Sequence, residues 1–311
     1  MPKKALSNTA LNLHPGLVIA SHGRHYKVLL DETGEILEAH RRGKRGDVCV
    51  GDRVLCTTPD SGVAAIEEIR ERDNILFRSD EWRIKTLAAN VDQVAVVFAS
   101  RPSFNPWFIW KALLAANQAG IDAFVIRNKR ELSQGAEEAK AQLALLNQIG
   151  ERTLNVSALA EPEMTRTTLL ERLAGKTTLF VGQSGMGKST LLNLLIPKAE
   201  AATREFSEAL DLGKQTTTAA QWYSGEADGW QGAIIDTPGF QEFGLAHLSL
   251  NDILRAMPDI SQHIDGCRFF NCRHLHEPGC SVKKALEEGK IDTERYAFYA
   301  SLAQTADATR Q

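Results

Sequence analysis

The first third of the chain is a series of short apolar or alternating runs that predict strands. Between residues 16 and 69 these runs are LVIA, HYKVLL, EILEAH, DRVLC and AAIEEI, separated by glycine, aspartate and proline. A period of two is typical of half-buried strands. Five such runs predict a small closed barrel of the OB type over residues 15–71, and an SH3-like barrel would give a similar pattern. Residues 1–14 lack the apolar core of a signal peptide and predict a flexible arm.

Over residues 72–243 strands and helices alternate. The strand-like runs are VDQVAVVFA, DAFVIRNK, RTLNVSA, TTLFVG and QGAIIDTPG. The helical runs between them are PWFIWKALLAANQAG, SQGAEEAKAQLALLNQIG and MTRTTLLERLAG, with Pro106 at a helix start and Gly120 and Gly150 at helix ends. This alternation predicts a parallel sheet covered on both faces, with ligands at the carboxyl ends of its strands.

Residues 244–311 predict a third, mostly helical domain. SLNDILRAM indicates one helix, a cluster of cysteine and histidine follows, and SVKKALEEGKIDTERYAFYASLAQ predicts two more helices. The expected architecture is therefore multidomain: an OB-like barrel, a central α/β domain and a helical domain around the Cys/His cluster.

Composition narrows the classes of protein that the chain can belong to. With 43% hydrophobic and 24% charged residues, the 311-residue chain can bury a core. A net charge of −3 means that any nucleic-acid contact must rest on a local patch. No apolar run approaches the roughly 20 residues of a membrane span, so no membrane contact is expected. Five cysteines do not suggest a disulfide framework, and a reducing cytoplasm is expected.

GQSGMGKS, residues 182–189, fits the phosphate-binding pattern G-x-x-x-x-G-K-[ST], and it follows a strand and opens a helix. Glycines let backbone N–H groups close around phosphates, and the helix N-terminus adds its positive end. Lys188 is expected to reach the β- and γ-phosphate oxygens, and Ser189 to bind Mg²⁺. The nucleotide-binding residues expected here are Gly182, Gln183, Ser184, Gly185, Met186, Gly187, Lys188, Ser189 and Thr190.

Two segments downstream of this loop predict the rest of a magnesium and γ-phosphate site. Asp236 in AIIDTPG ends a strand and is expected to bind Mg²⁺, with the backbone N–H of Gly239 against the γ-phosphate. DTPG is also an acceptable simple turn. GKQTTTAA contains three threonines, of which Thr217 is favoured as a further Mg²⁺ ligand; the alternative is a solvated threonine-rich loop.

The candidate base-reading segment lies upstream of the phosphate loop. A carboxylate that accepts hydrogen bonds from N1–H and N2–H₂ selects guanine over adenine. NKRE provides Asn128, Lys129 and Glu131 at the end of the strand DAFVIR. Ser157 and Ala158, which end the strand RTLNVSA, are expected to support the base from the opposite side.

Cysteine and histidine gather in DGCRFFNCRHLHEPGCSV. Cys267, Cys272, His274 and Cys280 form a C-x₄-C-x-H-x₅-C array that suits a closed, structural Zn²⁺ site. His276 is the alternative imidazole ligand, and unligated buried cysteines are the alternative to a metal site. Cys49 and Cys56 lie in apolar strand patterns and are expected in the core.

NKRE, SAL, GQSGMGKST, TTT and DTPG are five GTPase motifs in circularly permuted order. With the barrel and the Cys/His cluster, the chain closely resembles the RsgA (YjeQ) family of ribosome-dependent GTPases from about Gly16 onward. The resemblance implies an enzyme that hydrolyses GTP, binds the small ribosomal subunit late in its maturation and leaves after hydrolysis. It favours His274 as the zinc ligand. It also supports rRNA contact by the cations of AHRRGKRGD, which are Arg41, Arg42, Lys44 and Arg45.

The chain departs from the family pattern at two positions, and its water-orienting residue is not evident. Glu131 stands where aspartate is common, and Gln215 stands where histidine commonly precedes the threonines. Phe240 follows DTPG, where many GTPases have a glutamine that orients the attacking water. Slow intrinsic hydrolysis that a partner accelerates is therefore expected, unless Gln215 supplies the missing amide.

Three functional hypotheses follow. The leading one is a monomeric, cytoplasmic GTPase that assists small-subunit assembly. The second is a nucleotide-switched RNA-binding module with incidental hydrolysis. The third is an ATPase or small-molecule kinase that uses the same phosphate loop.

Overall fold

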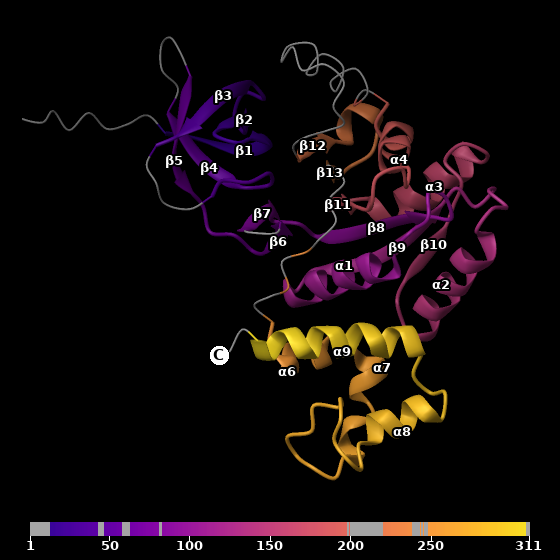
Figure 1. Ribbon diagram of the computed structural model, residues 1–311. Helices are drawn as coiled ribbons and strands as arrows, with labels where there is room; N and C mark the ends of the chain where they lie inside the picture. Colours follow the sequence, from indigo (N-terminus) through magenta and orange to yellow (C-terminus); the bar gives the residue numbers. More distant parts are fainter. Residues whose placement is uncertain are drawn as a thin grey trace, which may run out of the picture.

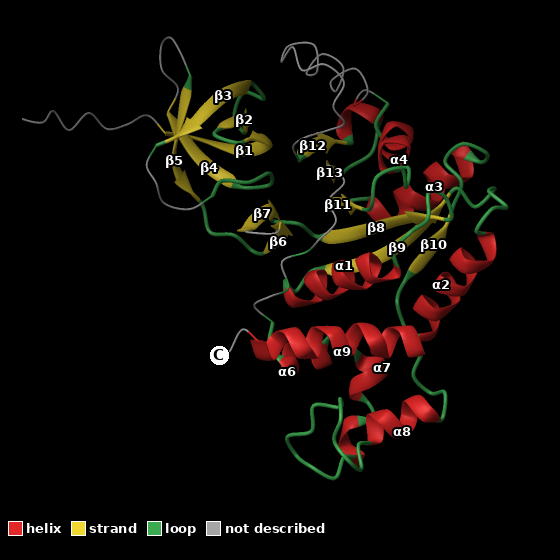
Figure 2. Cartoon of the chain, viewed as in Figure 1, coloured by secondary structure: helices red, strands yellow, loops and turns green. Residues whose placement is uncertain are grey.

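The computed structural model describes residues 13–42, 47–57, 63–80, 83–197, 199, 220–237, 243, 245 and 248–308. A barrel, a helix-covered sheet and a helical segment follow one another along the chain and in space (Figure 1). The first region is built from strands and loops, the second from strands and helices, and the last from helices and loops (Figure 2). None of the helices in these described ranges is long and apolar enough to cross a membrane.

The N-terminal region is a closed barrel, as the alternating pattern predicted. Within the barrel each strand pairs with two others, in the closed order β1-β2-β3-β5-β4-β1. Alternate side chains such as Val18, Val28 and Ile66 point inward and are buried. The strands are β1 Leu13–His22, β2 His25–Leu30, β3 Ile36–Arg41, β4 Arg53–Thr57 and β5 Ala64–Ile69.

The central region is a mostly parallel sheet. In spatial order its parallel strands are β10 Thr153–Asn155, β9 Asp122–Asn128, β8 Gln93–Ala99, β11 Thr177–Val181 and β13 Ala233–Asp236. The connecting helices are α1 Pro106–Gln118, α2 Ala136–Gln148, α3 Pro162–Leu173 and α4 Lys188–Leu195. Right-handed crossovers place α1 and α2 on one face and α3 and α4 on the other. All carboxyl ends of the parallel strands therefore meet at one edge.

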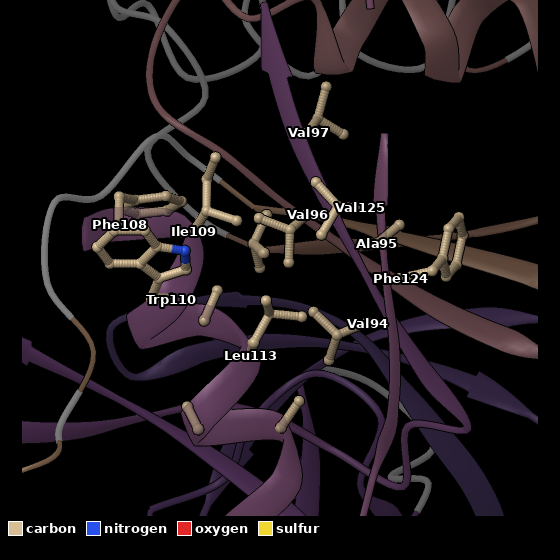
Figure 3. Close-up of a cluster of buried hydrophobic side chains, with 14 of the residues drawn as sticks. Val94, Ala95, Val96, Val97, Phe108, Ile109, Trp110, Leu113, Phe124 and Val125 are labelled. Atoms are coloured by element: carbon tan, nitrogen blue, oxygen red, sulfur yellow. The ribbon is translucent and has the colours of Figure 1, made fainter. Parts of the chain in front are cut away.

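The core of this region lies around β8, which is buried on both faces. Every residue of β8 is buried, including the polar Gln93, which explains why Val94–Ala99 is apolar without alternation. Figure 3 shows Val94 and Val96 of this strand beside Ile109 and Leu113 of α1. This packing fixes the position of the loop that leaves β8 at the ligand-binding edge of the sheet.

Two elements that the sequence pattern did not predict join the barrel to the sheet. The hairpin of β6 Ile75–Asp80 and β7 Arg83–Ala89 follows the barrel, and a Cβ at Gly51 would lie 2.0 Å from the Ala89 carbonyl oxygen. The short strand β12 Gln221–Ser224 pairs antiparallel with β13 and, at Gln221, with Ala20 of β1. The barrel and the parallel strands thus share one continuous sheet.

The C-terminal segment packs on α1 from below in Figure 1. Its helices are α6 Leu250–Arg255, α7 Pro258–Ser261, α8 Ser281–Glu287 and α9 Thr293–Ala308. The Phe298 ring of α9 lies 5.7 Å from Trp107 and 5.4 Å from Trp110, between ring centroids. Arg295 pairs with Asp259 at 2.9 Å, and both side chains are largely buried. The two helices predicted after the Cys/His cluster are confirmed as α8 and α9.

Candidate nucleotide and metal sites

The phosphate loop connects β11 to α4, and its glycines are required by close contacts. A Cβ at Gly182 would lie 2.4 Å from the Val97 carbonyl oxygen, so the loop runs directly against β8. Gly185 and Gly187 have φ angles of +78° and +94°, which side chains rarely adopt. These φ angles give the loop a tight turn that leads directly into the N-terminus of α4, where backbone N–H groups can bind a phosphate.

Lys188 is held inside this loop. Its side chain is 8% exposed, and Nζ donates to the carbonyl oxygens of Gly182 at 2.7 Å and Gln183 at 3.3 Å. The pKa of Lys188 is lower than that of a free lysine because the side chain is buried, and the Asp236 carboxylate opposes this shift in part. The ammonium group is thus positioned where the loop would close around phosphates.

Asp236 ends β13, beside β11, and is 5% exposed. Burial raises its pKa to about 6, against the opposing effects of the Lys188 ammonium and the Thr237 backbone N–H. Its Oδ1 atom is buried and has no hydrogen-bond partner within the described part of the chain. Oxygen ligands are what Mg²⁺ requires, so this orphaned carboxylate oxygen fits a divalent cation.

Asn128, at the end of β9, connects the base-reading loop to the phosphate loop. Its Nδ2 donates to the Met186 carbonyl oxygen at 3.3 Å, and its Oδ1 accepts from the Ala158 backbone N–H at 3.2 Å. A Cβ at Gly187 would lie 2.3 Å from Asn128 Nδ2, so that glycine also makes room for the asparagine. Three motifs far apart in sequence are therefore in direct contact.

Lys129 lies across the phosphate loop. Its backbone has a φ of +58°, and its Nζ donates to the carbonyl oxygens of Gly185 at 2.6 Å and Arg101 at 3.1 Å. These bonds fix the distance between the phosphate loop and the segment that would hold the base.

Glu131 is exposed, and its Oε2 accepts a hydrogen bond from the buried Ser157 hydroxyl at 2.5 Å. A carboxylate has about four acceptor positions, so the remaining ones are available to the two N–H groups of a guanine edge. Ser157, which was predicted to lie on the opposite side of the base, thus orients the Glu131 side chain.

Sequence reasoning missed supporting residues on both sides of the site. Thr165 of α3 accepts from the Ser157 backbone N–H at 3.2 Å and donates to its carbonyl at 2.9 Å. The backbone N–H of Asn105 donates to Gln183 Oε1 at 2.8 Å, and a Cβ at Gly185 would lie 2.9 Å from Pro102. Asn105 and Pro102 could have been found from the sequence, because SRPSFN directly follows the buried strand β8 at the ligand-binding edge. Nothing in the sequence singled out Thr165.

Several predicted residues lie outside the described part of the chain. They are the γ-phosphate and Mg²⁺ candidates Thr217 and Gly239, the positions Gln215 and Phe240, and the barrel cations Lys44 and Arg45.

The Cys/His array forms one compact cluster. The ligand atoms of Cys267, Cys272, His274 and Cys280 all lie within 4.8 Å of one another, and in the described ranges this is the one group of such side chains able to hold a metal. Nδ1 of His274 lies 3.4 Å and 3.5 Å from the sulfurs of Cys267 and Cys280. His276 is exposed and outside the cluster.

Surrounding side chains hold the ligands in place. His274 has a φ of +61°, and its carbonyl accepts from the Tyr296 hydroxyl at 2.7 Å. The Glu277 carboxylate accepts from the backbone N–H groups of Arg273, Leu275 and His276, so its charge faces the loop. Three thiolates and one imidazole in a closed, supported cluster fit a metal ion without an open coordination position.

The fold and these two sites define the chain as a circularly permuted P-loop nucleotide-binding protein, because the base-reading strand precedes the phosphate loop in sequence but lies beside it in space. A family model described as RsgA GTPase matches residues 69–246. The chain belongs to this family and is a GTP-hydrolysing enzyme.

Relatives and solved structures match over nearly the whole chain. The "Small ribosomal subunit biogenesis GTPase RsgA" of Paraburkholderia xenovorans is 46% identical, covering 94% of this chain and 93% of the relative. The protein of the same name from Bordetella pertussis is 46% identical over 96% and 98%. The crystal structure of YjeQ from Thermotoga maritima has a TM-score of 0.67 at 28% identity, covering 94% of this chain and 98% of that one. YloQ, described as a circularly permuted GTPase, has a TM-score of 0.65 at 25% identity over 99% of each chain.

Proposed function

We propose that this chain hydrolyses GTP to GDP and phosphate as a late assembly factor of the small ribosomal subunit. The subunit stimulates hydrolysis, and the protein leaves after it. The observation that carries this proposal is the identity of 46% over almost the full length to proteins named as small-subunit biogenesis GTPases. The hydrogen bond between the base-reading loop and the phosphate loop supports it, as does the position of Asp236 opposite Phe180 on the strand that leads into the phosphate loop.

In this proposal the residues around the phosphate loop bind and orient the triphosphate. Lys188 contacts the β- and γ-phosphate oxygens, and the N–H groups at the start of α4 orient the same oxygens. Ser189, Asp236 and Thr217 hold Mg²⁺, which supplies neutralisation of the phosphate charge when bound. Gly239 contributes its backbone N–H to the γ-phosphate. Exclusion of water from the buried Asp236 and Lys188 strengthens each of these contacts.

Glu131 is proposed to read guanine together with Asn128, Lys129, Ser157 and Ala158. We expect Glu131→Ala to weaken GDP binding on the order of 10²-fold and to leave ADP binding unchanged, because charge-assisted hydrogen bonds to the base are lost. Competition of GDP and ADP against a fluorescent nucleotide measures both affinities. Glu171→Ala, which removes an exposed carboxylate of α3, is the matched control. A wild-type ratio of GDP to ADP affinity in Glu131→Ala would exclude this role.

The metal in the Cys/His cluster is proposed to be a structural Zn²⁺. Thiolate and imidazole ligands in a tetrahedral array favour Zn²⁺ over hard cations such as Mg²⁺. The support is the convergence of four ligand atoms on a loop whose backbone is already hydrogen-bonded.

The barrel is proposed to contact rRNA through Arg41, Arg42, Lys44 and Arg45, with the protein acting as a cytoplasmic monomer. Arg42 pairs with Glu67 at 3.0 Å, but its side chain remains 68% exposed. Exposed ion pairs contribute little and are screened by salt, so this pair does not prevent Arg42 from contacting phosphate.

The test of the whole proposal is multiple-turnover GTP hydrolysis with and without purified small subunits. We expect the subunits to raise the turnover number tenfold or more, since ordering of a catalytic loop by a partner commonly has effects of at least this size. Large subunits are the control. Equal turnover with small subunits, large subunits and no subunits would contradict the proposal and favour a nucleotide-switched RNA-binding module.

A further inference from the structure

A cavity of about 410 Å³ lies between the loop that leaves β8, the helix α2 and the start of α9. Figure 1 shows α2 beside this end of α9. The residues that line the cavity belong neither to the nucleotide site nor to the metal site. Its volume suits a small ligand or a long side chain rather than a single buried water.

Two buried polar side chains on the wall of the cavity each have an unsatisfied atom. Ser100 is 1% exposed and Gln142 is 6% exposed, and both line the cavity. The Ser100 Oγ and the Gln142 Nε2 have no hydrogen-bond partner within the described part of the chain. Buried polar atoms in folded proteins almost always have partners, so two orphaned atoms on one cavity indicate a ligand that completes them. Because Nε2 is a donor, this ligand must offer an acceptor.

The charge that lines the cavity is negative. Glu138 of α2, Glu294 of α9 and Asp292, which precedes α9, line it, whereas none of its described lining residues is a lysine, arginine or histidine. Arg101, just after β8, and Arg127, near the end of β9, lie outside the lining. Three carboxylates around one cavity repel one another, and a cation placed among them offsets this repulsion.

Cations that neighbour these carboxylates in sequence are bound elsewhere. Lys140 pairs with Glu137 at 2.8 Å, and the Arg295 guanidinium pairs with Asp259 at 2.9 Å. It is the backbone N–H of Arg295 that donates to Asp292 Oδ1, at 2.9 Å. The positive charge that the cavity lacks is therefore a requirement on its ligand.

The cavity also has an apolar part. Phe104 and Leu145 line it and are partly buried. A lysine or arginine side chain carries its cation on methylene groups that pack on such a surface, and a cation is attracted to the face of an aromatic ring. The backbone carbonyl of a bound peptide supplies the acceptor that Gln142 requires. A polyamine has the cations and the methylene groups but no acceptor, so a polypeptide fits the cavity better.

We propose that this cavity binds a lysine or arginine side chain of a basic polypeptide. The cation pairs with Glu138 and Glu294. Its methylene groups pack on Phe104 and Leu145, and a peptide carbonyl accepts a hydrogen bond from Gln142 Nε2. The inference does not depend on the proposed function, because none of these residues is assigned to the nucleotide or the metal.

Binding of a capped synthetic peptide, GKGRG, to the full-length, metal-loaded protein tests the proposal. Isothermal titration calorimetry at low ionic strength measures its affinity for the wild type, for Glu138→Gln, for Glu294→Gln and for the double variant. We expect affinity to fall about threefold in each single variant and about tenfold in the double variant, because each change removes one partly exposed ion pair. Glu171→Gln, which removes an exposed carboxylate of α3, is the matched control and should bind like the wild type.

Two further ligands and one further variant identify the chemistry. The same peptide with norleucine in place of both cationic residues keeps the apolar stems, and its binding should be at least tenfold weaker because the ion pairs are lost. Gln142→Leu should weaken binding of GKGRG about threefold but leave that of spermidine unchanged, since spermidine has no acceptor for the amide. The glutamate variants, which change exposed positions, carry the test if Gln142→Leu does not fold.

The outcomes separate a peptide site from the alternatives. Equal affinity of the double variant and Glu171→Gln for GKGRG indicates attraction by net charge alone and overturns the inference. Binding of the norleucine peptide as tight as that of GKGRG indicates an apolar groove and overturns it too. Tighter binding of spermidine than of GKGRG, with the same loss in the glutamate variants, assigns the cavity to polyamines instead. Failure of the wild type to bind GKGRG also overturns the inference.

Discussion

Replacing Lys188 with alanine is expected to lower GTP turnover by on the order of 10²- to 10³-fold, with and without a stimulating partner, because the main cation positioned for the phosphates is lost. The side chain is 8% exposed and is anchored by Gly182 and Gln183. Its ammonium is therefore already in position before substrate binds, and no exposed lysine can replace it. Single-turnover and steady-state hydrolysis of GTP measure the effect.

The structure also supplies the control and the reason that folding should survive. Asn128 and Lys129 hold the loop through Met186 and Gly185, independently of the Lys188 side chain. Lys188→Ala should therefore melt near the wild-type temperature. Lys140→Ala removes an exposed lysine of α2 that pairs only weakly with Glu137, and it should keep full turnover. Turnover of Lys188→Ala within tenfold of the wild type would exclude the assigned role.

Circular permutation has little effect on the geometry of the site. β9, β8 and β11 are neighbouring parallel strands, so the segments that leave their carboxyl ends meet whatever their order in the chain. Asn128 can thus contact Met186, although the base-reading loop is encoded first. A sequence rule that expects this loop downstream of the phosphate loop would overlook it, whereas the position of both at strand ends identifies them.

The sequence predicted those strands and helices whose own pattern of apolar and polar residues shows which side chains are buried. Buried and partly exposed positions alternate in the barrel strands β2 and β5, and β8 is apolar from Val94 to Ala99. β12 is different: its four residues QWYS carry little pattern, and they form a strand because β13 and β1 lie on either side. Pairing between distant segments cannot be deduced from periodicity in a window of a few residues.

The same distinction applies to the sites. Spacing alone identified the three cysteines, but it left His274 and His276 as alternatives. Their difference is tertiary: His274 is 3% exposed and adopts a φ of +61° that the Tyr296 hydroxyl supports, whereas His276 is exposed. Thr165 likewise acts on Ser157 only because α3 docks where it does.

The second large effect is expected from removal of the metal. Cys272→Ser, or treatment with a chelator, should release the metal and unfold the loop of residues 267–280 while the barrel and sheet stay folded. Structural zinc contributes about 10–16 kcal/mol to the folding of small zinc-dependent peptides, and this loop has few buried apolar side chains of its own. When the metal leaves, the buried cysteine thiols lose their metal bonds and form no hydrogen bonds in their place. Metal analysis and amide hydrogen exchange, resolved by segment, measure both parts of the prediction.

A buried cysteine of the barrel provides the matched control. Cys56→Ser changes the same atom in a fully buried residue that lies outside the metal cluster, so it should retain the metal and the protection of residues 267–280. The helix α9 should lose only part of its protection in Cys272→Ser. Its Phe298 packs on Trp107 and Trp110 independently of the cluster, whereas Tyr296 loses the His274 carbonyl as a fixed acceptor. Wild-type metal content in Cys272→Ser would exclude Cys272 as a required ligand, whereas loss of the metal with unchanged exchange in the loop would show that protein contacts alone hold the loop.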